Sequence, residues 1–249
     1  MKRWLAAVLL LCLLIPAFVS GNAPRMPAIT LIIDDLGDRL PEGWRVVELP
    51  GPVVAALLPD TPHARELAKA ARRAGKEVLI HMPMQAINGA DPGPGALTLD
   101  MDEQQFHDVV QRALTTVPGA SGMNNHMGSL ITQHPGHMAW LMAMLRDHDS
   151  DMVFVDSRTT SRSVATAIAR ENGVAHVQRD VFLDHDPDPA SIRRELHRLL
   201  ARARRDGTAI GIGHPYPQTL DVLEEELPRL AADFGVELIS LRDLMERRQ

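Results

Sequence analysis

Two adjacent acids, Asp34 and Asp35, stand at the end of the apolar, β-branched run 28–33. Such a run predicts a buried strand, and acids at its end are costly to desolvate unless a partner compensates their charge. Because neighbouring strand residues point to opposite sides, one carboxylate could bind a metal while the other faces a substrate. Taken alone, an Asp-Asp pair is equally typical of a helix cap or a turn. The histidines that follow later strands favour the chemical interpretation.

Those histidines could complete a metal site. His81 comes directly after the apolar run 77–80, and His126 follows 119–123. Zn²⁺ takes imidazole nitrogen and carboxylate oxygen as ligands, and a catalytic site keeps one position open for water. We therefore predict that Asp35, His81 and His126 bind a divalent metal, with Zn²⁺ as the preferred ion. One His after a strand is more often hydrogen-bonded within a loop, so the prediction depends on the three residues coming together.

Strands and helices alternate along the rest of the chain. After the first run, further strands are predicted at 53–58, 77–80, 119–123, 152–155, 174–177, 208–212 and 236–240. Helices are predicted at 62–74, 102–116, 135–148, 163–171, 189–205 and 217–233. This alternation, with no break in composition, indicates one parallel α/β domain.

The polar residues after the strands favour a barrel over an open, doubly wound sheet. In a (β/α) barrel the strand ends converge on one face, whereas in an open sheet they spread along an edge. No Gly-rich phosphate loop follows the first strand. We predict an irregular (β/α) barrel of about seven strands, formed by residues 24–249 as a single domain.

The N-terminus has the pattern of a secretory signal peptide. Lys2 and Arg3 precede the apolar stretch 4–19, which is short for a membrane span. We assign 1–23 to this signal and expect a periplasmic or secreted protein, with an uncleaved anchor as the alternative. Cys12, the only cysteine, lies inside the signal, so the mature chain has no disulfide.

Composition and charge argue against several partners. Hydrophobic residues make up 45% and charged residues 23% of the chain, as in globular proteins. The formal net charge is −6, and −8 without the two cations of the signal. A net acidic chain without a Lys/Arg block is a poor candidate for binding nucleic acid or an anionic membrane surface. The arginines of 193–205 are predicted to lie mostly on the solvated face of one helix.

The motifs at the strand ends resemble those of the polysaccharide deacetylases, in particular the divergent branch found in bacterial envelopes. The resemblance covers nearly all of the mature chain, in segments 32–37, 75–81, 122–129, 154–159, 179–184 and 210–215. Segment 122–129, Gly-Met-Asn-Asn-His-Met-Gly-Ser, is the most specific signature of this branch. By resemblance, Asp34 is the catalytic base, Asp35 binds the metal and His81 is a further ligand.

The resemblance also implies a mechanism. The metal polarises an acetyl carbonyl and lowers the pKa of its water toward ~7, and Asp34 takes the proton from that water. His214 would protonate the leaving amine. Asn125, Ser157 and Arg158 could bind the sugar or the oxyanion.

The chain departs from the usual family pattern at two places. Gln85 stands where ordinary deacetylases carry a second His, four residues after His81. Asn124, Asn125 and His126 stand where the third motif has an Arg that orients the base. A His moved from one strand end to another could restore the metal triad.

Three functions stay open on these grounds. The leading one is a metal-dependent hydrolase that removes acetyl groups from an envelope glycan or a peptidoglycan fragment. The second is a degenerate periplasmic barrel that binds glycan or an envelope protein without turnover. A two-metal phosphoesterase is disfavoured because it normally needs several more carboxylates or histidines.

Two of the polar segments also have a purely structural interpretation. Segment 156–158 is equally typical of a helix cap with a salt bridge. For 184–186 a turn is preferred to a ligand role.

Overall fold

The computed structural model describes residues 25–248, so the predicted signal 1–23 lies outside the described part of the chain. In residues 25–248, nine strands form one parallel sheet. They are β1 (Ala28–Leu36), β2 (Val54–Leu57), β3 (Val78–Met84), β4 (Gly122–Met127), β5 (Val153–Asp156), β6 (Ala175–Gln178), β7 (Val181–Phe182), β8 (Thr208–Gly213) and β9 (Glu237–Leu238). Eight of them follow the order β6-β5-β4-β3-β2-β1-β8-β7, and β9 pairs with the start of β1.

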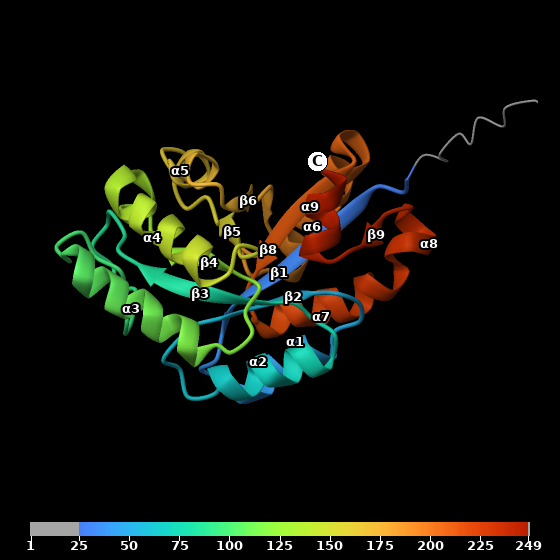
Figure 1. Cartoon of the computed structure of the whole chain (residues 1–249). Helices are drawn as coiled ribbons and strands as arrows, with labels where there is room; N and C mark the ends of the chain where they lie inside the picture. The colour runs from blue at the N-terminus through green and yellow to red at the C-terminus, as the bar shows by residue number, and fades with distance from the viewer. Residues whose placement is uncertain (1–24, 249) are drawn as a thin grey trace, which may run out of the picture.

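Helices pack along the curled sheet (Figure 1). They are α1 (Leu40–Glu48), α2 (Ala64–Arg73), α3 (Glu103–Thr116), α4 (Pro135–His148), α5 (Ala165–Glu171), α6 (Pro189–Asp206), α7 (Pro217–Glu226), α8 (Leu230–Phe234) and α9 (Leu241–Arg247). Within residues 25–248, none of the helices combines the length and the apolarity that a membrane crossing needs.

The predicted class, an α/β protein with an irregular (β/α) barrel, is confirmed. The barrel is incomplete, because no pairing joins β6 to β7 within the described residues. There are more strands than predicted, since β7 has only two residues and is too short to produce a periodic pattern. Helix α1 was also missed, although Pro41 in its first turn is a start signal. The single helix predicted at 217–233 is divided into α7, a short 3₁₀ turn and α8, with Pro228 at the break.

Strand β1 is buried on both faces, as a central strand of a barrel must be. Its residues Ile29, Leu31 and Ile33 belong to the core between sheet and helices, whereas Ile32 belongs to a second core inside the barrel. Alternation along the strand produces these two layers. Thr30 also points inward and donates its hydroxyl to the carbonyl oxygens of residues 239 and 240, just before α9. The strand that carries both acids is therefore held from both sides.

Strand β4 approaches β5 so closely that only glycine fits at its first residue. A Cβ built on Gly122 would lie 2.3 Å from the carbonyl oxygen of Val153 and 3.1 Å from Leu79 Cδ2. The backbone oxygen cannot move away without breaking the pairing of β4 with β5. This close approach sets the position of β4, whose later residues 124–126 face the strand ends of β1 and β3.

We expect Gly122→Ala to lower the free energy of unfolding by about 1–3 kcal/mol, because the added methyl group overpacks the sheet. Gly136→Ala is the matched control, since the nearest atoms to its Cβ would belong to His134 at 3.6 Å, an ordinary contact. The control should leave stability unchanged or raise it by up to about 1 kcal/mol, because Gly136 lies in α4. Urea unfolding followed by circular dichroism measures both; equal effects of the two substitutions would contradict the close approach.

Candidate active site

The two acids of β1 lie on an irregular stretch of strand. The backbone of Asp35 is left-handed, with φ 55°, and the register of β1 against β2 shifts between Ile33 and Leu36. Strict alternation, which predicts opposite directions for neighbouring side chains, does not hold at such a bulge. Both carboxylates reach the same imidazole: Asp35 Oδ1 lies 3.1 Å and Asp34 Oδ2 lies 3.6 Å from His81 Nε2. The bulge therefore places two acids at one site.

The three predicted metal ligands come together from β1, β3 and β4. Asp35 Oδ1 lies 2.8 Å from His126 Nδ1, and His126 Nδ1 lies 3.2 Å from His81 Nε2. Their three ligand atoms all lie within 4.8 Å of one another. Tetrahedral donors at ~2.1 Å from one ion are separated by roughly 3.4 Å, which is close to this spacing.

The donor set also fits a cation chemically. Asp35 Oδ1 is buried, and neither neighbouring imidazole meets it with the alignment of a hydrogen bond. Although burial opposes ionisation, the proximity of His126 and His81 holds the pKa of Asp35 well below its ordinary value. A carboxylate and two imidazole nitrogens that converge in this way are the ligands that Zn²⁺ prefers. The residues present therefore fit a divalent metal.

Asn124, on β4, connects the base candidate to a ligand candidate. Its Nδ2 donates to Asp34 Oδ1 over 2.8 Å, and its Oδ1 lies 2.8 Å from His81 Nδ1. The amide nitrogen of Asn124 faces the carboxylate of Asp34, so its amide oxygen faces the imidazole of His81. The imidazole therefore donates from Nδ1, and its Nε2 is free to face Asp35 and His126 as a candidate metal ligand. Burial raises the pKa of Asp34, and this hydrogen bond works against the rise. In the sequence, Asn124 is only a departure from the family's Arg, so its connecting position was not predicted.

His214, at the end of β8, is oriented by Asp184. Its Nδ1 lies 2.9 Å from Asp184 Oδ1, while Asp184 Oδ2 accepts from the backbone N–H of His214 and from Thr219 Oγ1. The other ring nitrogen, Nε2, lies 3.7 Å from Asp35 Oδ2. Burial disfavours the imidazolium, but the hydrogen bond and charge of Asp184 prevail and raise the pKa of His214 to about 9.

Asp184 was predicted to belong to a turn, and its contact with His214 was not anticipated. The side chain is buried in the protein. Two sequence signals pointed to Asp184: the acid after an apolar pair, and its place in the family segment 179–184. The strand itself gave no signal, because β7 has only two residues.

A cavity of about 380 Å³ opens beside these groups. Asn125, Ser157 and Arg158, the predicted substrate-binding residues, all line it. Asn125 accepts from the backbone N–H of Ser157 and donates to the carbonyl of Met127, so its amide connects β4 to the end of β5. Asp156 accepts from the backbone N–H of Arg158 two residues later, which forms an Asx turn at the end of β5. The helix cap with a salt bridge considered for 156–158 is not present, because α5 begins only at Ala165 and the described residues show no ion pair for Arg158.

Two further residues line this cavity and were missed as site residues. Arg179 follows β6 and donates to the carbonyl oxygens of Ser157 and Arg158. Its guanidinium carbon lies 5.1 Å from the ring centroid of Phe182, in β7. Both belong to segment 179–184, which in the sequence is recognisable only as a family signature.

Gln85 does not join the metal cluster. Its Oε1 accepts from the backbone N–H of Leu99, and its own backbone N–H donates to the carbonyl of Leu97. Gln85, at the position of the usual second His, thus fixes the loop that follows β3 through hydrogen bonds to its backbone. His126, one strand away, supplies the imidazole that approaches Asp35.

The sequence was compared with those of known families and proteins. The profile of the divergent polysaccharide deacetylases matches residues 31–245. An uncharacterized protein of Haemophilus influenzae is 38% identical over 216 residues, which cover 87% of this chain and 76% of that protein.

Solved structures show the same fold. An uncharacterized protein of Agrobacterium tumefaciens superposes with a TM-score of 0.82 at 23% identity, over 90% of this chain and 91% of its own. A family 4 carbohydrate esterase of Streptomyces lividans, in complex with acetate, superposes with a TM-score of 0.51 at 15% identity, over 85% and 91% of the two chains. At these identities the likeness concerns the fold alone.

We expect the protein to bind about one Zn²⁺ per chain, as a three-ligand cluster would. Asp35→Asn, His81→Ala and His126→Ala should each weaken binding at least 100-fold, because loss even of residues behind the ligands typically costs about 10–100-fold. His148→Ala is the control, since this exposed His ends α4, away from the cluster. Competition with a chromophoric chelator measures the affinities. Unchanged metal binding in His126→Ala would contradict the assignment of this ligand.

Proposed function

Because the chain belongs to the divergent polysaccharide deacetylase family, we propose that it is a metal-dependent hydrolase that removes acetyl groups from a bacterial envelope glycan. The observation that carries the proposal is one constellation at the strand ends. Asp35, His81 and His126 converge on a point, with Asp34 and His214 beside them. We further propose that the protein acts in the periplasm or outside the cell, on the ground of the signal pattern in 1–23.

The three candidate ligands would together hold one metal ion, which would activate both the acyl carbonyl and the attacking water. The chemistry that a divalent cation supplies at such a site is polarisation of an acyl carbonyl and a water whose pKa falls toward ~7. Asp35, His81 and His126 would hold it. The cavity of about 380 Å³ beside them has a size typical of small-ligand sites, so an acetylated sugar can approach the cluster.

Asp34 is the group that we assign to accepting the proton of the attacking water. Its Oδ2 stands 3.6 Å from His81 Nε2, beside the cluster and not at its centre. Burial raises its pKa, so that it is a stronger base than an exposed carboxylate. Asn124 holds the other oxygen and thereby orients the carboxylate.

His214 is the group that we assign to donating a proton to the leaving amine or alcohol. Its Nδ1 is engaged by Asp184, so Nε2 is the atom that faces the site. With a pKa of about 9, the ring is mostly protonated at neutral pH and can donate. Asp34 and His214 therefore form an acid–base pair whose environments suit opposite roles.

Acetate release tests the proposed activity. The zinc-loaded protein should release acetate from an acetylated glycan, and Asp34→Asn should lower kcat about 10²–10⁴-fold while keeping the metal, because general base catalysis is lost. Asp38→Asn, in an exposed acid four residues later, is the matched control and should retain activity. Release that persists in Asp34→Asn would contradict the role of the base. Glycan binding without any release would instead favour the non-catalytic barrel.

Asp184→Asn tests how His214 is oriented. An amide in place of the carboxylate removes the negative charge that favours the imidazolium, so we expect kcat to fall at least tenfold with little change in KM. Zinc content should stay at the wild-type level, since the side chain of Asp184 contacts His214 and Thr219 and none of the predicted ligands. Steady-state kinetics together with metal analysis measure the effect. A rise in KM alone, with kcat unchanged, would assign Asp184 to substrate binding instead.

A further inference from the structure

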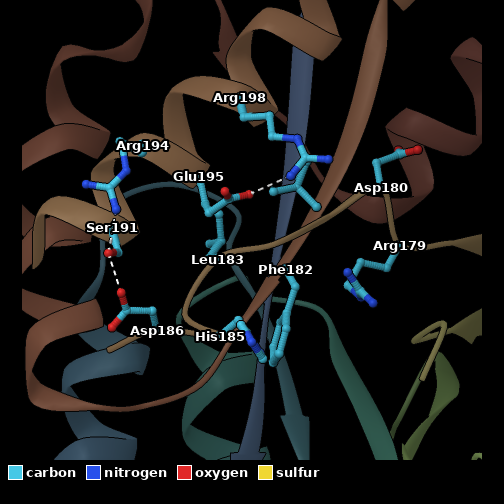
Figure 2. A pocket seen from close by; sticks show the side chains of 11 residues that line it. Arg179, Asp180, Phe182, Leu183, His185, Asp186, Ser191, Arg194, Glu195 and Arg198 are labelled. Carbon is cyan, nitrogen blue, oxygen red and sulfur yellow. Dashed lines mark hydrogen bonds and ion pairs between the residues drawn. The ribbon is translucent and has the colours of Figure 1, made fainter. Parts of the chain in front are cut away.

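A second cavity of about 390 Å³, whose lining residues Figure 2 shows, adjoins the active-site cavity. It lies between β7, the loop after it and the first turns of α6. Arg179 and Phe182 line both cavities, so the two meet at these side chains. Each cavity has the volume of a small-ligand site. We call these two cavities together the groove; their linings run from His81 and His126 through Phe182 to Arg194 on α6.

Three guanidinium groups along this groove make no ion pair with a carboxylate of residues 25–248. They belong to Arg158, Arg179 and Arg194. Arg179 is half-buried and donates only to backbone carbonyls, and Arg194 donates to Ser191 Oγ over 2.7 Å. Other arginines of α6 pair with acids, among them Arg193, Arg202 and Arg205. Of the two α6 arginines that line the second cavity, Arg198 pairs with Glu195, so Arg194 is the one there without a carboxylate partner in the described chain.

Two of the acids that line the second cavity already have cationic partners. Asp180 is held by Arg202 at 3.1 Å and Arg248 at 3.0 Å, and Figure 2 shows its carboxylate pointing away from Arg179. Glu195 pairs with Arg198 at 3.2 Å. These ion pairs leave little negative charge to repel an anion.

The third acid, Asp186, lies at the rim of the cavity. It accepts from Ser191 Oγ over 2.6 Å, and Figure 2 shows Ser191 between it and Arg194. Its presence limits the excess of positive charge near Arg194. A singly charged carboxylate suits this balance better than a doubly charged phosphate group does.

We propose that this groove binds a carboxylate of the glycan substrate, on the sugar next to the acetylated one or on a substituent of that sugar. The assignment rests on the proposed function, because it takes the acetylated sugar to lie at the metal cluster. Arg194 is exposed at the far end and has no acidic partner among the described residues, and its planar guanidinium fork can bind a carboxylate through two parallel hydrogen bonds.

The aromatic ring at the junction supports the same path. Phe182 is only partly buried, its ring centroid lies 5.3 Å from that of His214, and the guanidinium of Arg179 lies over the ring. A sugar ring that leaves the metal cluster would cross this apolar surface before its carboxylate reaches Arg194. The groove would thereby select anionic over neutral acetylated glycans.

Binding of matched oligosaccharides tests the proposal. In zinc-loaded protein with Asp34→Asn, which prevents turnover during titration, calorimetry compares four probes. They are an N-acetylglucosamine tetramer, an N-acetylglucosaminyl-N-acetylmuramic acid disaccharide, the same disaccharide with its carboxylate converted to an amide, and a phosphorylated disaccharide. The acid should bind about tenfold more tightly than its amide, as expected for a charge-assisted hydrogen-bonded pair.

Variants on α6 locate the effect. Arg194→Gln should abolish the preference for the acid over the amide, whereas Arg205→Gln should keep it, since Arg205 pairs with Asp206 outside the groove. Equal binding of acid and amide, or a preference that survives Arg194→Gln, would overturn the proposal. Tighter binding of the phosphorylated probe would overturn the choice of carboxylate.

The same experiments separate this proposal from the proposed function. Charge-dependent binding without acetate release from the unsubstituted protein would support the carboxylate site and refute the proposed activity. Acetate release with equal binding of acid and amide would support the proposed activity and refute the carboxylate site.

Discussion

The arrangement of this protein depends on keeping two carboxylates and two imidazoles together in a mostly buried place. Asp34 and His81 are almost completely buried, and Asp35 is partly buried beside them. Charges in such surroundings are tolerated only when each has a partner that compensates its lost hydration. Asn124 supplies one such partner through two hydrogen bonds, and the bulge at Asp35 supplies another by turning its carboxylate toward the imidazoles. Removing either would leave a buried charge without compensation.

The incomplete barrel leaves one side of the strand ends open. A parallel barrel brings the carboxyl ends of its strands to one face, and here β1, β3, β4 and β8 deliver the acids and histidines. Because β6 and β7 are not paired with each other in the described chain, the wall is interrupted beside the cluster. Arg179 and Phe182 come from this interruption. The same irregularity that weakens the barrel thus forms the groove that leads to α6.

The divergence of this family is also visible in physical terms. Gln85 replaces an imidazole with a group that holds the loop after β3, and His126 offers an imidazole from the neighbouring strand. Parallel pairing sets Pro83 of β3 beside His126 of β4, so a ligand can change strands while the cluster stays in place. Asn124 in turn contacts Asp34, at the motif where the usual deacetylase pattern has an arginine. Different side chains can therefore supply the imidazole near Asp35 and the hydrogen bond to Asp34.

The alternation of strands and helices, the strand-end location of the polar residues and the candidate trio Asp35, His81 and His126 can all be predicted from the sequence. Periodicity and strand-end convergence are local or generic rules, so they apply without a structure. The hydrogen-bond partners of these residues, in contrast, follow from the packing of distant segments. Asn124 meets Asp34 across 90 residues, and His214 meets Asp184 across 30, through a strand of two residues that leaves no pattern. The left-handed backbone of Asp35 likewise depends on its register with β2. Such contacts arise from packing between distant segments, which a one-dimensional pattern does not encode.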